Sequence, residues 1–303
     1  MRAYSPMDDS DRQVTPMAKL AALLEVVLVF AALHVTYRGI KHFSAWGSFE
    51  GSLGLNLTPG IAMIAFTFGM IALHGRAWRS YGLILDDWRQ HASLAIVCIL
   101  VAAAVVGPLL LWFAPHHDPR PAPRAVQAII GTAANLAAAL IFLVVMRRCS
   151  WPMTGLPPMV SMPLIAAIAA SPVLVAAWRH KPVEPAAIEA LWLFIGAGFG
   201  EELFFRGYVQ SRVDQAFGQP WSVLGTLLGP GVLVSAALFG MIHVLNPVDY
   251  FHGRFDFAWW WFPNEFAAGL VMGCIRARTG SVLPCAVLHG LGDIIGTLPG
   301  LFG

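Results

Sequence analysis

The amino-acid sequence predicts an all-α protein, a polytopic transmembrane bundle of about eight or nine helical spans, on three observations. First, 57% of the 303 residues are hydrophobic and 12% are charged, whereas soluble globular chains contain roughly 45–50% apolar and about 25% charged residues. Second, the mean hydropathy is +0.67. Third, apolar runs of about 20 residues, the length that crosses the hydrocarbon core, recur along the chain. A net charge of +2 without any block of like charge excludes a nucleic-acid-binding surface.

Nine apolar runs are separated by polar segments such as 86–89, 116–119 and 147–148. The first run is longer than the core of a signal peptide, which is roughly 7–15 residues, so we expect it to be retained as a span. Each run is expected to be a helix, because an isolated strand leaves its backbone groups unsatisfied in lipid. In chain order the expected spans are Leu20–Tyr37, Ile61–Gly75, Ser93–Ala114, Ala125–Met146, Met159–Trp178, Ala186–Tyr208, Val232–Leu245, Ala258–Ile275 and Val282–Leu301.

The four cysteines are scattered, mostly in or beside apolar runs, and no C-x-x-C spacing indicates zinc or a redox pair. They are Cys98, Cys149, Cys274 and Cys285. We interpret them as small buried hydrophobic residues.

Ionisable side chains inside apolar helices cost roughly 2.5–3.5 kcal/mol each on insertion scales, so they indicate where function lies. The first group is Glu201, Glu202 and Arg206, which follow an apolar run. Glu202 and Arg206 are four residues apart with the acid first, the favourable order for an ion pair on a helix. Glu201 is turned onto a neighbouring face. We therefore expect one glutamate to be neutralised and the other to be free to act.

Two further groups lie on later spans. Phe239 and His243 are four residues apart and share one helix face, and His289 and Asp293 do the same on another helix. Together with the glutamate pair, three helices supply carboxylates and histidines. The occurrence of all three groups in one chain indicates a functional site more specifically than any single group does.

This set of residues suits hydrolysis. A glutamate can take a proton from water, a histidine can hold that water, and further donors can stabilise the oxyanion. Two histidines and a carboxylate could equally ligate Zn²⁺ with one position open for water. From the residues alone, both mechanisms stay open.

Other intramembrane chemistries can be checked by motif. The sequence contains neither H-E-x-x-H nor G-x-S-x-G, which excludes the metalloprotease and serine-nucleophile signatures. Residues 290–293 read G-x-G-D, as in presenilin-like aspartyl proteases, but that chemistry needs a second membrane aspartate to share a proton. No other aspartate lies within an expected span.

These residues resemble the CAAX protease and bacteriocin-processing enzyme family, the CPBP intramembrane proteases, which include the type II CAAX prenyl endopeptidases. The resemblance covers about Pro185 to Leu301. The segment 266–281 also looks like the linking segment of the family. The family motifs E-E-x-x-x-R, F-x-x-x-H and H-x-x-x-N/D match, in order, Glu201, Glu202 and Arg206; Phe239 and His243; and His289 and Asp293.

The resemblance implies a glutamate-dependent peptidase in a helical bundle. Glu201 and His243 would position the attacking water, and His289 with residue 293 would stabilise the oxyanion. No cofactor is assigned, and Zn²⁺ stays open as an alternative. Position 293 is Asp rather than the frequent Asn, so we expect Asp293 to be protonated, to orient His289 or to ligate a metal.

The expected organisation is a polar tail over 1–18, motif-free transmembrane helices over 19–184 and a protease core over 185–303. Histidines of the first half, such as His34, are expected at the interface. The leading hypothesis is an intramembrane endopeptidase acting on a membrane protein or peptide in the lipid bilayer, as a multi-pass protein of the bacterial inner membrane. The alternatives are a non-catalytic immunity or scaffold protein with the same fold and a proton-coupled transporter.

Overall fold

The structure, a computed structural model, describes residues 15–54, 56–113, 124–148 and 156–302. The polar segment 116–119, Cys149 and most of the tail expected over 1–18 lie outside the described residues. Apart from one two-stranded hairpin, the regular secondary structure of the described residues is helical. The predicted all-α class is confirmed.

Each of the nine expected spans overlaps a helix. In the described part, four helices are long and apolar enough to cross a membrane: α1 (Pro16–Phe43), α3 (Leu57–His74), α6 (Pro158–Trp178) and the continuous helix Val183–Phe217. Shorter apolar windows occur in α4 (Trp88–Phe113), α5 (Arg124–Arg148), α9 (Pro230–Val244) and α11 (Leu283–Phe302). The remaining long helix, α10 (Phe262–Thr279), carries charged residues that lower its hydropathy.

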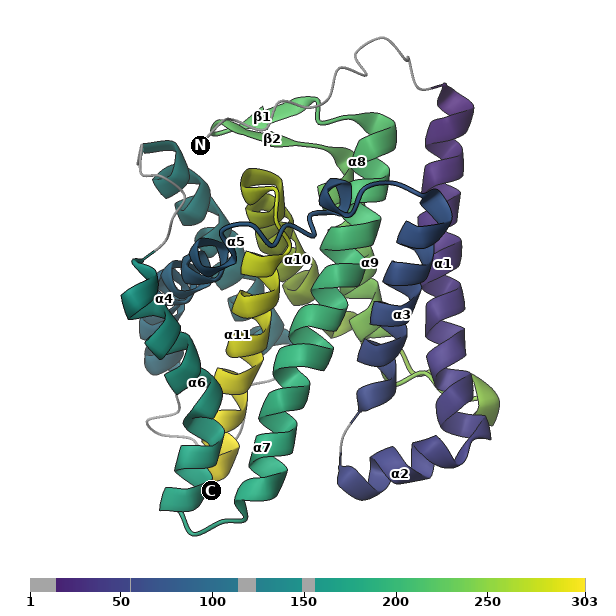
Figure 1. Ribbon diagram of the computed structural model, residues 1–303. Helices are drawn as coiled ribbons and strands as arrows, with labels where there is room; N and C mark the ends of the chain where they lie inside the picture. The colour runs from purple at the N-terminus through teal and green to yellow at the C-terminus, as the bar shows by residue number, and fades with distance from the viewer. Residues whose placement is uncertain (1–14, 55, 114–123, 149–155, 303) are drawn as a thin grey trace.

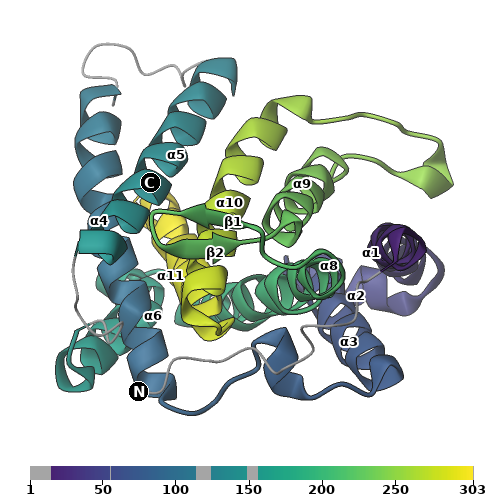
Figure 2. The same cartoon turned by 90° about the horizontal axis from the view of Figure 1, so that it is seen from above.

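The helices form three groups (Figures 1 and 2). Helices α4, α5 and α6 lie on one side of the molecule, and α1, α2 (Ala45–Leu53) and α3 lie on the other. The continuous helix 183–217 and α9, α10 and α11 lie between them. The three groups of candidate residues all belong to this central set.

The continuous helix changes its geometry where the glutamates lie. It begins as α7 (Val183–Trp192), continues through π-helical segments at Leu193–Glu201 and Leu203–Gln210, and ends as α8 (Ser211–Phe217). The π geometry is rare and occurs mostly as short insertions at functional sites. The expected span 186–208 lies inside this longer helix.

Two connections around α9 were not expected from the sequence. Strands β1 (Trp221–Val223) and β2 (Thr226–Leu228) pair antiparallel before α9. The two turn residues between them have positive φ, Leu224 at 50° and Gly225 at 80°, as the tightest hairpin turns require. After α9, short 3-10 turns occur at Tyr250–His252 and Trp259–Trp261.

The span expected over 258–275 becomes an α-helix only at Phe262, because Trp259–Trp261 form a 3-10 turn. Aromatic side chains join the first helices to the central set. Phe30 of α1 lies 6.5 Å from Phe205 between ring centroids, and Phe205 lies 5.3 Å from Phe239 of α9. These rings belong to the largest buried cluster, which covers the glutamate-bearing helix on the α1 side.

Candidate active site

Glu202 and Arg206 form the ion pair expected from their spacing. Arg206 Nη1 donates to Glu202 Oε1 over 2.8 Å, and both side chains are 0% exposed. Arg206 Nη2 also donates to the carbonyl oxygen of Gly269, and the guanidinium lies 4.4 Å from the ring centroid of Phe239. A carboxylate, a backbone carbonyl oxygen and the face of an aromatic ring therefore surround the guanidinium.

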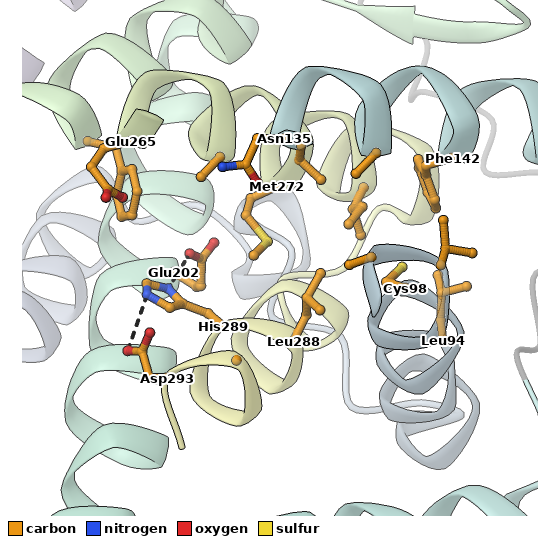
Figure 3. Close-up of a pocket in the computed structure, with 18 of the residues that line it drawn as sticks. Leu94, Cys98, Asn135, Phe142, Glu202, Glu265, Met272, Leu288, His289 and Asp293 are labelled. Atoms are coloured by element: carbon orange, nitrogen blue, oxygen red, sulfur yellow. Dashed lines mark hydrogen bonds and ion pairs between the residues drawn. The ribbon is translucent and has the colours of Figure 1, made fainter. Parts of the chain in front are cut away.

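Glu202 has a second partner that its spacing did not indicate. His289 Nδ1 lies 2.8 Å from the same Glu202 Oε1, and His289 Nε2 lies 3.6 Å from Asp293 Oδ2 (Figure 3). Because a carboxylate only accepts unless it is protonated, we assign the proton of this bond to Nδ1. Glu202 thus links the arginine of its own helix to the histidine of α11.

Close backbone approach makes this link possible. A Cβ added to Gly198 would lie 2.7 Å from Gly290 Cα, and one added to Gly290 would lie 2.9 Å from Phe194 Cα. Such distances are too short for any side chain, so both positions require glycine. The two glycines let α11 lie against the π-helical segment and bring His289 to Glu202.

The ring of Phe239 packs against both His243 and His289. The centroid of the Phe239 ring is 4.9 Å from that of His243 and 5.8 Å from that of His289. His243 Nδ1 lies 2.8 Å from the carbonyl oxygen of Phe239. Since a carbonyl only accepts, Nδ1 carries the proton and Nε2 is left as the acceptor of a neutral ring.

Glu201 differs from Glu202 in its contacts. Its Oε2 is buried and has no hydrogen-bond partner among the described residues. Four other candidate residues interact with it electrostatically, namely Glu202, His243, His289 and Asp293. The expected contrast between an engaged and a free glutamate is therefore present, although Glu202 also keeps one unpartnered oxygen.

A cavity of about 370 Å³ opens beside these residues, within the usual range of ligand sites. Glu202, His289 and Asp293 lie at its polar end, and most of the other lining side chains are apolar, including Leu94 of α4 (Figure 3). Glu201, Arg206 and His243 do not line it, so half of the six candidate residues lie at the cavity wall. The remaining lining residues are Val97, Cys98, Val101, Ala102, Asn135, Ala138, Phe142, Phe239, Asn264, Glu265, Ala268, Val271, Met272, Ile275, Leu288 and Gly292.

Three polar residues of the cavity were missed by the sequence analysis. Asn135 Nδ2 donates to Asn264 Oδ1 over 3.1 Å, and Asn264 Nδ2 donates to Glu265 Oε1 over 3.0 Å. Asn135 belongs to α5, in the half of the chain without a motif. The sequence did offer a sign of Asn135, which is a lone amide side chain in an apolar transmembrane run. Such side chains usually hydrogen-bond to another helix.

The cysteines and His34 can now be placed. Cys98, Cys274 and Cys285 are buried and free, as expected. His34 was expected at the interface, but it is 1% exposed and shares a hydrogen bond of 2.9 Å with the hydroxyl of Tyr37. Its position is therefore inside the protein, on the face of α1 that packs against the core.

The zinc alternative was tested on the donor set. Among the described residues, no group of three or more His, Cys, Asp and Glu side chains is arranged to hold a metal ion. His289 faces Glu202 with one ring nitrogen and Asp293 with the other. With both ring nitrogens of His289 facing carboxylates, these residues do not fit a zinc site.

Comparison with known proteins gives one match. Residues 183–295 match the family model described as type II CAAX prenyl endopeptidase Rce1-like. No curated protein and no solved structure matches the chain. All three motifs, from Glu201 to Asp293, lie inside the matched segment, and the family resemblance inferred from them is confirmed.

Proposed function

We propose that this chain is an intramembrane endopeptidase that hydrolyses peptide bonds with water activated by Glu201. The match of residues 183–295 to the Rce1-like family of type II CAAX prenyl endopeptidases supports this proposal. The family implies a protease of CAAX-protease type, and the apolar helices make it a membrane protein. We propose in addition that catalysis depends on glutamate and that the substrate is a membrane protein or peptide in the lipid bilayer. We place the enzyme in the bacterial inner membrane.

One observation carries the proposal, namely the contrast between the two adjacent glutamates. Glu202 Oε1 faces both Arg206 and His289 at 2.8 Å, so its negative charge is compensated. Glu201 Oε2 is buried without a partner. A carboxylate oxygen in this state can accept a proton from water, as a general base must.

The proton balance of the reaction follows from these positions. Water held between Glu201 and His243 Nε2 attacks the carbonyl carbon of the scissile peptide bond, and Glu201 takes its proton. The carbonyl oxygen becomes an oxyanion, which is stabilised by the Nε2–H of His289 at the polar end of the cavity. The C–N bond then breaks, and Glu201 returns the proton to the leaving amine.

Asp293 determines how strongly His289 donates. If Asp293 is ionised, it accepts from Nε2–H and orients the ring; if it is protonated, it adds a donor of its own. When Asp293 is ionised, His289 carries a proton on both ring nitrogens, with Nδ1–H donating to Glu202 and Nε2–H facing Asp293. Protonation of Asp293 and orientation of His289 are both roles that the sequence analysis expected for Asp293.

The grouping of charges favours an enzyme over a proton-coupled transporter. A relay needs its acids and histidines along a path through the membrane. Here Glu202, His289 and Asp293 meet at the polar end of one cavity whose remaining walls are mainly apolar. Such a cavity suits a membrane-associated substrate, with its apolar part in the cavity and a peptide bond at the polar end.

The test is the turnover of a fluorogenic peptide ending in a prenylated CAAX motif, with the unprenylated peptide alongside. Glu201→Gln keeps the shape of the side chain but cannot accept the proton, so we expect turnover to fall by about 10²–10⁴ while the protein stays folded. Glu189→Gln is the matched control, because Glu189 is exposed on the same helix. Full activity of Glu201→Gln would contradict the proposed role.

A zinc measurement accompanies this test. Stoichiometric zinc in the purified active enzyme, lost to a chelator together with activity and recovered on adding the metal back, would replace the glutamate-only mechanism.

A further inference from the structure

The C-terminal half of α1 contacts the segment that directly follows His243. Helix α9 ends at Val244, one residue after the histidine, and the chain then runs out to α1 before returning to α10 (Figure 2). Helix α1 lies outside the segment matched by the family model. Its contacts therefore extend the candidate site into a part of the chain to which no function has been assigned.

Arg38 makes the polar part of this contact. Its Nη2 donates to the carbonyl oxygen of Leu245 over 3.2 Å and to that of Asn246 over 2.5 Å. Leu245 is the C-cap residue of α9, and its carbonyl oxygen also accepts from the backbone N–H of Val248 over 3.0 Å. A positive charge at this end of a helix is favourable. Arg38 thus caps the end of α9 from a distance of 207 residues in the chain.

Aromatic contacts hold the next residues of the segment on α1. Tyr250 lies 5.5 Å from His34 between ring centroids. Phe251 lies 4.9 Å from His42, with the rings stacked, and 4.8 Å from Phe43. The segment from Leu245 to Phe251 is therefore fixed to α1 at both of its ends.

The restraints on His243 lie in its own helix and in the connection after it, and its ring packs 4.9 Å from that of Phe239 between centroids. Its Nδ1 bonds to the carbonyl oxygen of Phe239 in the preceding turn, and its ring meets Trp261 edge-on at 6.0 Å. Both contacts move with α9 and with the segment that follows it. The backbone position of His243 therefore depends on where the end of α9 is held.

We propose that Arg38 is a positioning residue that fixes His243, through the carbonyls at the end of α9, in the place where it holds the attacking water. This inference rests on the proposed function. A catalytic group displaced by about 1 Å can lose on the order of 10²-fold in rate, so the cap bears on turnover as well as on folding.

The chain offers a matched control at the other end of α1. Arg212 of α8 forms an ion pair with Glu25 of α1, with Nη2 and Oε2 2.8 Å apart. Glu25 precedes Arg38 by 13 residues, about 20 Å along the helix. Both arginines tie α1 to the central helices, but only Arg38 touches the residues after His243.

The experiment compares Arg38→Met, Arg38→Lys and Arg212→Met in full-length enzyme. We expect Arg38→Met to lower kcat by about 10- to 100-fold with KM within about twofold, because the geometry of the water site is lost while the substrate cavity is kept. Arg38→Lys keeps a cationic donor, so the decrease in log kcat should be at most half of that found for Arg38→Met. Arg212→Met should keep kcat within about twofold of wild type. Unchanged kcat in Arg38→Met, or equal losses in the two Met variants, would overturn the inference.

A second readout does not need peptidase activity. The rate at which diethylpyrocarbonate modifies His243 can be followed by mass spectrometry of its peptide. Arg38→Met should raise this rate several-fold, and Arg212→Met should leave it unchanged. If the wild type cleaves no peptide, the proposed function fails, and the modification rates alone decide the positioning role. Equal rates in wild type and Arg38→Met would refute it.

Discussion

Removing Glu202 should destabilise the protein because it isolates a buried cation. In Glu202→Ala the Arg206 guanidinium, 0% exposed, loses its carboxylate and keeps the carbonyl oxygen of Gly269 at 3.3 Å and the faces of the Phe239 and Phe205 rings. Breaking a buried ion pair from one side costs roughly 3–5 kcal/mol. We expect the free energy of unfolding to fall by about that amount.

The reverse change should cost less. In Arg206→Met the carboxylate of Glu202 still accepts from His289 at 2.8 Å. The lost interaction is then a charged hydrogen bond, which contributes roughly 1.5–3 kcal/mol. The double variant Glu202→Ala/Arg206→Met leaves no unpaired charge, so it should recover about 2 kcal/mol or more relative to Glu202→Ala alone.

The assay measures unfolding of the three variants in detergent micelles together with their peptidase turnover. The double variant should regain stability but stay inactive, because His289 Nδ1 has lost its acceptor in both. A double variant as unstable as Glu202→Ala would refute the assignment of the cost to the unpaired arginine. Regained activity would show that Glu202 matters only as the partner of Arg206.

Three further predictions concern the rest of the site. Asp293→Asn should keep at least about a tenth of the turnover, whereas Asp293→Ala should lose about 10²–10³-fold, as loss of an oxyanion donor does; equal losses accompanied by loss of bound metal would indicate a metal ligand instead. Gly290→Ala should cost about 1–3 kcal/mol and much of the activity by separating α11 from its neighbour, whereas Gly292→Ala, with no atom within 4 Å of the added Cβ, should fold normally. Arg254 donates to Asp249 over 2.7 Å and holds the pKa of that carboxyl below its usual range, so a titration followed by NMR should find it lowered, and Arg254→Ala should raise it. At a pH above the ordinary pKa of Asp249, its ionised carboxylate stabilises this loop. That stabilisation is lost as the pH falls through the lowered pKa of Asp249.

Much of the fold was predictable because it depends on local hydrophobicity. The nine apolar runs coincide with helices, since a segment in lipid must satisfy its own backbone. The ion pair of Glu202 and Arg206 was predictable for the same reason, because a four-residue separation fixes which side chains meet on one helix. The short hairpin and the late start of α10 depend on turn geometry, which a hydrophobic pattern does not encode.

The sequence by itself singled out the candidate residues, since buried charges in apolar helices are costly and few. Only the tertiary structure decided how they combine. Glu202 and His289 are 87 residues apart, and their contact depends on two glycines that let separate helices touch. Asn135 and Arg38 come from a half of the chain without any motif, and they reach the site only when α5 and α1 pack against the central helices. Contacts between residues this far apart follow from helix packing, which the spacing within one helix cannot specify.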